Sequence, residues 1–325
     1  KLDVSREETF VCNRVRHAIR THIISYVRPD GTFAARKMEC FSDQGAYASH
    51  GHGIAAKGMG AFPQLYPCEN LECDAYTVFT NKPVSGAMRG YGIPQAMFAG
   101  ESHIDDVARA LHMDPLAFRR KNMMPVGYVD DFSKNENYSD SLNQCIEKGM
   151  EYLDYARKKE AYAKETGPVR HGVGMAIFWY NTAVWPISLE SSSCRMVLNQ
   201  DGSIQLQMGE TEIGQGADTA FAQMAAEALG IPFASVHVIS TQDTDVTPFG
   251  LGAYASRQTY VGGFSIKQTA LLMRERILKY AYELTRMPPF EMDIVDGNIL
   301  RKSDGRVLMT LGELATEALY SLSHS

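Results

Sequence analysis

The chain has 325 residues, 32 of them basic and 38 acidic, which gives a formal charge of −6. This length predicts about two domains at roughly 150 residues each. A net negative charge provides no uniform cationic field for a nucleic-acid backbone, so nucleic acid is not an expected partner. No apolar run in the sequence reaches the ~18 residues of a membrane helix, so no membrane association is expected. Six thinly spread cysteines favour a reducing compartment, and we expect a cytoplasmic protein.

The N-terminal part of the chain predicts a sheet with helices packed on it. Residues 16–24 and 74–80 are rich in β-forming side chains, and the sequence Pro29-Asp30-Gly31 predicts a turn between two such runs. After Pro94, a favoured first helical residue, apolar side chains recur at helical spacing. Asp114 and Pro115 then predict the cap and first turn of a second, shorter helix.

A polar, acidic stretch at residues 127–139 has the composition of an exposed linker. We therefore predict a first domain over residues 1–126 and a second domain over residues 140–325, with each domain incomplete at its outer end. Strands of the second domain are expected near residues 172–180, 192–198, 203–208 and 236–239. Its helices are expected over residues 142–156, 217–229 and 266–284. The predicted fold class is α+β, with two domains that each mix sheet and helix.

The common catalytic signatures are missing from the sequence. It contains no Gly-Lys-Ser/Thr phosphate loop, no His-Glu-x-x-His helix, no Gly-x-Ser-x-Gly elbow and no calcium loop. Gly90-Tyr91-Gly92 and Gly51-His52-Gly53 have partial glycine spacing. Neither opens a helix after a strand with the third glycine in place, so a dinucleotide-binding fold is not favoured.

Three segments combine small residues, which let a ligand approach the backbone, with a polar group that could orient it. They are Ser85–Gly92, Gly209–Gly216 and Gly252–Gln258. The last two immediately precede predicted helices, where unpaired N–H groups favour an anion or a polar heterocycle. The amide of Gln215 suits a heterocycle because it donates and accepts in one plane. Each segment alone is more typical of a turn or cap, whereas all three together favour a shared cofactor.

These segments resemble signature segments of the molybdenum-binding subunit of the xanthine dehydrogenase and aldehyde oxidase family of molybdenum hydroxylases. The resemblance rests on residues 87–95, 209–216 and 255–258, which occur in the same order. Residues 43–47, 118–122 and 242–249 also match. Because the resemblance extends over essentially the whole chain, we interpret the sequence as the central part of such a subunit.

The resemblance implies a molybdopterin-type cofactor that is held without a covalent bond and without a direct protein ligand to the metal. The segment expected beside the metal is Ala87, Met88, Arg89 and Gly90. The residues expected to hold the pterin and its phosphate tail are Gly214, Gln215, Gly216, Ala255, Ser256, Arg257 and Gln258. Tyr91, in place of a family Phe, and Lys57 are expected in the substrate pocket. Lys57 stands where animal xanthine enzymes carry an arginine, so the charge is kept without the bidentate fork.

The implied reaction is hydroxylation of a purine or another N-heterocycle with oxygen from water. Electrons would pass to 2Fe–2S clusters and FAD on partner subunits, which implies a hetero-oligomer. Two alternatives stay open: a catalytically incomplete cofactor-domain fragment or split subunit, and an aldehyde oxidase-like enzyme. We expect the stretch of 325 residues to be inactive by itself.

Several family features have no clear match in the sequence. The general-base Glu lies in a Gly-Glu-Pro-like segment, but neither Glu101 nor Glu313 is followed by proline, so we expect the base beyond Ser325. A glycine-rich segment with a substrate-binding Glu is expected before Lys1. An aromatic residue that stacks on the substrate is expected within the range Phe178 to Trp185. The pairs His50/His52 and Asp243/Asp245 are interpreted as structural.

Overall fold

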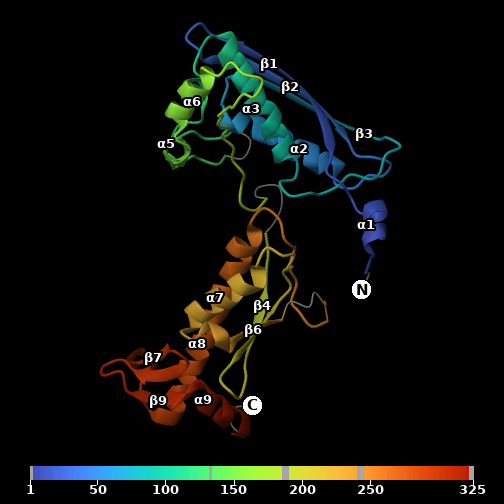
Figure 1. Cartoon of the computed structure of the whole chain (residues 1–325). Coiled ribbons are helices and arrows are strands. Elements are labelled where there is room, and N and C mark those ends of the chain that lie inside the picture. The colour runs from blue at the N-terminus through green and yellow to red at the C-terminus, as the bar shows by residue number, and fades with distance from the viewer. Residues whose placement is uncertain (1–2, 132–133, 185–189, 240–242, 244, 322–325) are drawn as a thin grey trace. The chain divides into compact units, whose positions relative to one another are not determined.

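The computed structural model describes residues 3–131, 134–184, 190–239, 243 and 245–321 (Figure 1). The chain divides into two compact units, Lys1–Tyr180 and Asn181–Ser325. Within the described residues, strands form three sheets of three strands each, and every sheet is accompanied by helices. The α+β class predicted from the sequence is therefore confirmed.

The sheet of the first unit contains a hairpin and a crossover. Its strands are β1 (Ala18–Val27), β2 (Phe33–Asp43) and β3 (Asn70–Val78), in the order β1-β2-β3. β1 and β2 are antiparallel, and Gly31 in the connecting turn has a φ of 86°. β2 and β3 are parallel, because helix α2 (Gly51–Leu65) crosses between them.

Helices α2 and α3 (Ile93–Ala110) cover one face of this sheet (Figure 1). Pro94 lies in the first turn of α3, as predicted. The side chain of Asp114 accepts hydrogen bonds from the N–H groups of Leu116 and Ala117, which confirms the predicted cap of α4 (Pro115–Asn122). The remaining helices of this unit are α1 (Arg6–Cys12), α5 (Ser141–Leu153) and α6 (Tyr155–Ala163).

The division into units differs from the boundary predicted at residues 127–139. Ile146 on α5 is 1% exposed and belongs to the same apolar core as Leu116 and Phe118 of the first unit. The polar composition of residues 127–139 indicates exposure, but it does not show which core the next helix joins. The strand expected near residues 172–180 is wrong, because residues 171–180 carry no strand pairing.

The second unit begins its regular structure with a hairpin. Strands β4 (Cys194–Leu198) and β5 (Ile204–Met208) are antiparallel across the predicted turn, where Gly202 has a φ of 84°. β5 pairs in parallel with β6 (Val236–Ile239), after the crossover helix α7 (Ala217–Leu229) and the short 3-10 turn Phe233–Ser235. Leu206 lies at the centre of the core and is fully buried.

The long helix α8 (Gly263–Thr285) packs against α7 and follows a π-helical turn at Gln258–Gly262. Beyond the 3-10 turn Pro289–Glu291 lies a small antiparallel sheet. Its strands and the final helix are β7 (Met292–Val295), β8 (Asn298–Arg301), β9 (Val307–Thr310) and α9 (Leu311–Tyr320). Over the residues that the structure describes, no helix combines the length and the apolar character needed to cross a bilayer.

Candidate functional site

The predicted metal-side segment of the first unit ends in a turn of unusual backbone geometry. Gly90, Tyr91 and Gly92 have φ angles of 92°, 46° and 93°. A Cβ atom at Gly92 would lie 2.3 Å from the carbonyl oxygen of Ile54, so this position requires glycine. Tyr91 adopts a left-handed conformation that is uncommon for a bulky residue. The turn thus places Tyr91 beside α2 at the point where α3 begins.

Tyr91 is held against the start of α2. Its hydroxyl is hydrogen-bonded to Nδ1 of His50 at 2.9 Å, and the two rings meet edge to face. A Cβ atom at Gly53 would lie 2.8 Å from the Tyr91 hydroxyl oxygen, so glycine makes room for it. Burial raises the pKa of Tyr91, so the hydroxyl is neutral at pH 7. His50, interpreted as structural from the sequence, therefore orients a predicted pocket residue.

Lys57 and Tyr91 lie close to a common neighbour, Tyr180. The Lys57 Nζ atom is 5.7 Å from the centre of the Tyr180 ring, which is cation–π distance. Burial lowers the pKa of Lys57. Burial also raises the pKa of Tyr180, and ionisation of the nearby Tyr91 would raise it further. The two residues predicted for a substrate pocket thus belong to one cluster, which consists of Lys57, Tyr91 and Tyr180.

Ala87, Met88 and Arg89 are exposed. Hydrogen bonds with Val15 and Arg16 hold the two ends of this short segment in place. The N–H of Gly86 donates to the carbonyl of Val15, and Nη2 of Arg16 donates to the carbonyl of Arg89 at 2.6 Å. The segment is therefore both held in place and accessible to a ligand.

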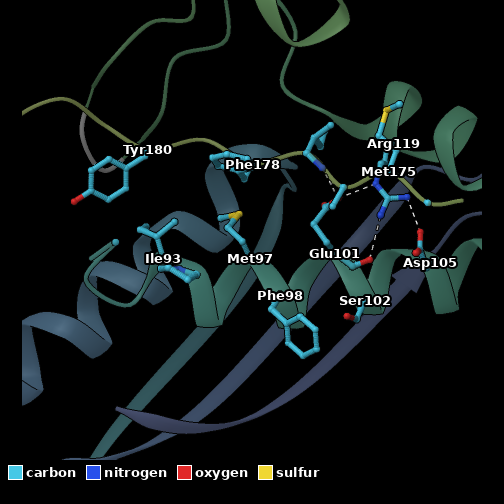
Figure 2. A pocket seen from close by; sticks show the side chains of 15 residues that line it. Ile93, Met97, Phe98, Glu101, Ser102, Asp105, Arg119, Met175, Phe178 and Tyr180 are labelled. Carbon is cyan, nitrogen blue, oxygen red and sulfur yellow. Dashed lines mark hydrogen bonds and ion pairs between the residues drawn. The ribbon is translucent and has the colours of Figure 1, made fainter. Parts of the chain in front are cut away.

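A cavity of about 680 Å³ lies along α3 (Figure 2), and Gly90 is among its lining residues. Apolar side chains make up most of its wall: Ile93, Met97, Phe98, Met175 and Phe178. Tyr180 lies at the end of the cavity near Ile93, and the ion pair between Glu101 and Arg119 lies at the other end (Figure 2). This apolar cavity therefore extends from the cluster around Tyr180.

Glu101 anchors the extended segment that forms one wall of the cavity. Its Oε2 accepts hydrogen bonds from Nε of Arg119 and from the N–H of Ile177, both at 2.8 Å. The hydroxyl of Tyr66 donates to Oε1 at 2.5 Å. The sequence does not mark Glu101 as a base, and in the structure this carboxylate is fully engaged. Glu313 caps α9, because its carboxylate accepts the N–H of Thr310.

The aromatic residues between Phe178 and Trp185 have different surroundings. Phe178 is 69% exposed, and Trp179 packs against the core of the first unit. Tyr180 faces Lys57, which makes it the candidate for contact with a substrate ring. Trp185 lies outside the described residues.

In the second unit, the segment Gly209–Gly216 bonds to its own backbone. The Glu212 carboxylate accepts the N–H groups of Gly214 (2.6 Å), Gly216 (3.2 Å) and Asp218 (3.2 Å) at the start of α7. These backbone bonds lower the pKa of Glu212. The sequence predicts that the N-terminus of this helix could bind an external anion. In the structure, a carboxylate of the chain itself already occupies it.

Gln215 lies beside Gln258, so the structure brings two of the predicted cofactor-binding segments together. Nε2 of Gln215 donates to Oε1 of Gln258 at 2.7 Å, and both amide groups donate to the carbonyl of Thr211. Gln215 is exposed and Gln258 is buried. The two segments therefore present one surface, on which Gln215 is the outward side chain.

Arg257 has surroundings that the sequence did not predict. Its side chain is fully buried and pairs with Glu190 and Glu210. The two preceding residues, Ala255 and Ser256, have φ angles of 46° and 53°. Ser256 lines a hollow of about 450 Å³ at the start of α8. Ala255 and Gln258 of the same segment are also buried, but Arg257 is the one that carries a charge into the protein interior.

Sequence reasoning missed the two acidic partners of Arg257. Glu210 and Glu190 are 0% and 11% exposed at their side chains. Glu210 lies in the predicted cofactor-binding segment Gly209–Gly216. A charged residue within such a glycine-rich loop is the signal that could have indicated a buried ion pair. Glu190 follows an apolar stretch with no recognisable spacing, so no local signal marks it. Asp243, by contrast, accepts the N–H of Asp245, as expected of a turn.

Comparison with known proteins provides the family. A model of the molybdopterin cofactor-binding domain matches residues 1–123, and a second model with the same description matches residues 148–324. The xanthine dehydrogenase molybdenum-binding subunit of Escherichia coli O157:H7 is 42% identical over 321 residues, which are 98% of this chain and 43% of that protein. This chain belongs to the molybdopterin cofactor-binding domain family.

Solved structures support the fold of these molybdopterin-binding domains. Quinoline 2-oxidoreductase from Pseudomonas putida 86 matches with a TM-score of 0.80 and 24% identity, over 99% of this chain and 42% of that chain. Aldehyde oxidoreductase from Desulfovibrio gigas matches with a TM-score of 0.71 and 28% identity, over 82% of this chain and 29% of that chain. The chain thus spans less than half the length of these relatives.

The exposed segments of the second unit fit a flat polar cofactor. At Gly214, Gly216 and Gly252, a Cβ atom would meet no other atom within 4 Å, so backbone faces open space at all three positions. Gln215 supplies an exposed amide between two of these glycines. Within the described residues, no group of three or more His, Cys, Asp or Glu side chains is arranged to hold a metal ion.

Proposed function

We propose that the protein containing this chain is a molybdenum hydroxylase that acts on a purine or another N-heterocycle, with 2Fe–2S and FAD subunits as electron-accepting partners. The observation that carries the proposal is the occurrence of two molybdopterin cofactor-binding domains in one chain. Each compact unit contains an exposed segment with glycine residues that the sequence predicts for cofactor binding. When bound, the cofactor supplies the transfer of a water-derived oxygen to an electron-poor carbon and takes up the electrons released.

The residues of the chain divide into two groups by role. Ala87, Met88, Arg89 and Gly90 form the segment beside the metal. Gly214, Gln215, Gly216, Ala255, Ser256 and Gln258 form the surface that holds the pterin, mainly through backbone groups. The amides of Gln215 and Gln258 bond to each other and to Thr211, and so fix that surface. The carboxylate of Glu212 keeps the start of α7 satisfied, so phosphate binding falls to the segment around Ser256.

Lys57 favours a heterocycle over a simple aldehyde as substrate. A half-buried ammonium group over the Tyr180 ring suits a flat ring that carries an oxo or ring-nitrogen negative charge. An aldehyde has no such charge to offer. Because the lysine lacks the planar fork of arginine, it holds such a group at one point and leaves the ring orientation to Tyr180 and Tyr91.

The test uses the complete gene product, expressed with its neighbouring genes in molybdate-supplemented medium. Molybdenum and pterin are measured per subunit, and turnover is assayed in ¹⁸O-labelled water with purines, other N-heterocycles and aldehydes. We expect bound molybdenum and a labelled hydroxyl in the heterocyclic product. Protein without molybdenum overturns the proposal, and turnover of aldehydes alone selects the aldehyde oxidase-like alternative.

A variant pair addresses the pocket. Lys57→Met should raise the KM for an oxo-purine roughly tenfold or more, because the lost ion contact is partly buried. Lys82→Met, at an exposed lysine of the same unit, serves as the matched control. The 325-residue stretch expressed alone should show no turnover, and robust hydroxylation by it would rule out the incomplete-fragment alternative.

A further inference from the structure

The guanidinium of Arg257 is fully used inside the second unit. Its Nε donates to Oε2 of Glu190 at 2.6 Å, and its Nη1 lies 2.8 Å from both carboxylate oxygens of Glu210. Nη1 also donates to the carbonyl of Gly252, and Nη2 donates to the carbonyl of Ser191. Each of the three nitrogens already has a protein acceptor. The side chain therefore has no nitrogen free of such bonds to offer to a phosphate.

The two carboxylates connect Arg257 to further segments. Glu210 accepts a hydrogen bond from the Ser192 hydroxyl at 2.8 Å, and Glu190 accepts one from the N–H of Val184 at 3.0 Å. Three stretches that are far apart in sequence thus meet at one buried cation. Burying such charges has a desolvation cost that an apolar cluster avoids. The geometry of the fork, rather than net stability, is the gain that this arrangement provides.

One residue further along each chain segment lie groups of the predicted cofactor-binding surface. Gln258 follows Arg257, and Thr211 follows Glu210. The Gln258 amide donates to the carbonyl of Thr211 at 2.9 Å and accepts from Gln215 at 2.7 Å. The buried ion pair and this amide cluster are therefore neighbouring contacts between the same two segments. A displacement of the ion pair shifts the amides directly.

The backbone before Arg257 also depends on it. Ala255 and Ser256 both have left-handed conformations, which persist only where the surroundings impose them. The carbonyl of Ala255 accepts the N–H of Ala183 at 2.7 Å, and the buried guanidinium holds the other end of this strained pair. The conformation of Ser256, and hence of the hollow at the start of α8, follows from both contacts.

We propose that Arg257 is a positioning residue for the cofactor: through Glu210 and Glu190 it aligns the Gln215–Gln258 amides and the strained turn at Ser256, and it does not itself touch the cofactor. The inference rests on the proposed function. It changes the role of Arg257 from phosphate contact to the alignment of its neighbours. Retention of cofactor should therefore depend on the planar fork of this residue and not only on its charge.

The test is Arg257→Lys in the complete gene product with its partner subunits. Lysine keeps the charge but provides one ammonium group in place of the fork that joins both carboxylates. Molybdenum and pterin per folded subunit are measured after purification, together with the rate of cofactor loss on prolonged dialysis. We expect at least tenfold faster loss than in the wild type. Pterin content reports on binding independently of turnover.

Arg274→Lys is the matched control. Arg274 lies on α8 of the same unit and pairs with Asp293 and with the carbonyl of Leu229, far along the helix from the proposed cofactor segments. Its replacement should lower the melting temperature yet leave cofactor loss within twofold of the wild type. If Arg257→Lys retains cofactor as well as Arg274→Lys does, the positioning role is overturned.

A milder variant decides the question if Arg257→Lys does not fold. Glu190→Gln keeps an acceptor for the N–H of Val184 but removes one of the two negative charges that pair with Arg257. This variant should speed cofactor loss several-fold. Unchanged retention in folded Glu190→Gln protein overturns the inference. A wild-type protein without molybdenum would instead refute the proposed function, so the two failures are distinguishable.

Discussion

Replacement of Glu101 by glutamine should destabilise the first unit, because this carboxylate holds the cavity wall to α3. Glu101 and Arg119 are 7% and 1% exposed at their side chains, so their ion pair is almost wholly removed from water. Breaking a buried pair costs about 3–5 kcal/mol. Arg119 keeps its contact with Asp105 at 2.6 Å, and the glutamine oxygen still accepts, so we expect the lower end, about 3 kcal/mol.

Tyr66→Phe gives a graded comparison at the same carboxylate. It removes one hydroxyl hydrogen bond to a charged group, which contributes about 1.5–3 kcal/mol. The double variant should lose less than the sum of the single losses, because both changes act on Glu101. Ser102→Ala is the control: this neighbouring residue on α3 also lines the cavity, and its loss should change stability by about 0.5 kcal/mol at most.

The assay is urea unfolding of the first unit followed by tryptophan emission. The chain has two tryptophans, and Trp179 packs against the core of this unit, two residues from the anchored Ile177. A Trp185→Phe background leaves Trp179 as the reporter. If Glu101→Gln shifts the unfolding free energy by less than about 1 kcal/mol, the carboxylate does not anchor the wall, and the reasoning is refuted.

Three further predictions concern the core, a helix cap and pH. Leu206→Ala should destabilise the second unit by about 2–5 kcal/mol in urea unfolding, whereas Leu272→Ala, at 60% exposure, should cost under about 0.5 kcal/mol; equal losses would contradict the core assignment. Glu212→Ala should speed hydrogen exchange of the amides at the start of α7, and unchanged exchange would show that the carboxylate is not the cap. Burial, together with the positive charge of Arg36, lowers the pKa of His103 below its ordinary 6.5. The unfolded chain therefore binds the proton more readily than the folded chain, and stability falls as the pH drops through 6.5. Melting temperatures at about pH 7 and 5 should show a smaller fall in His103→Gln than in the wild type, and an equal fall would exclude this histidine as the cause.

Much of the local structure follows from the sequence alone. Pro94 and Asp114 predict the starts of two helices, and both predictions are confirmed because a fixed φ and a capping carboxylate act within one turn of chain. The hairpin around Gly202 is confirmed for the same reason. The glycine-bearing segments are also visible without a structure, and the family matches cover the parts of the chain that contain them.

What the sequence could not determine is where each polar side chain finds its partner. The motif around Arg257 predicts a residue that holds the pterin or its phosphate tail. In the structure, the acceptors of Arg257 are Glu190, 67 positions away, and Glu210, 47 positions away. In the same way, Ile177 donates to a carboxylate across 76 positions in place of joining a strand. Turn chemistry and periodicity are local properties of the chain and can be read in order. Burial and pairing of charges arise only when distant segments meet, so only the tertiary structure decided which predicted residues are exposed and which are buried in ion pairs.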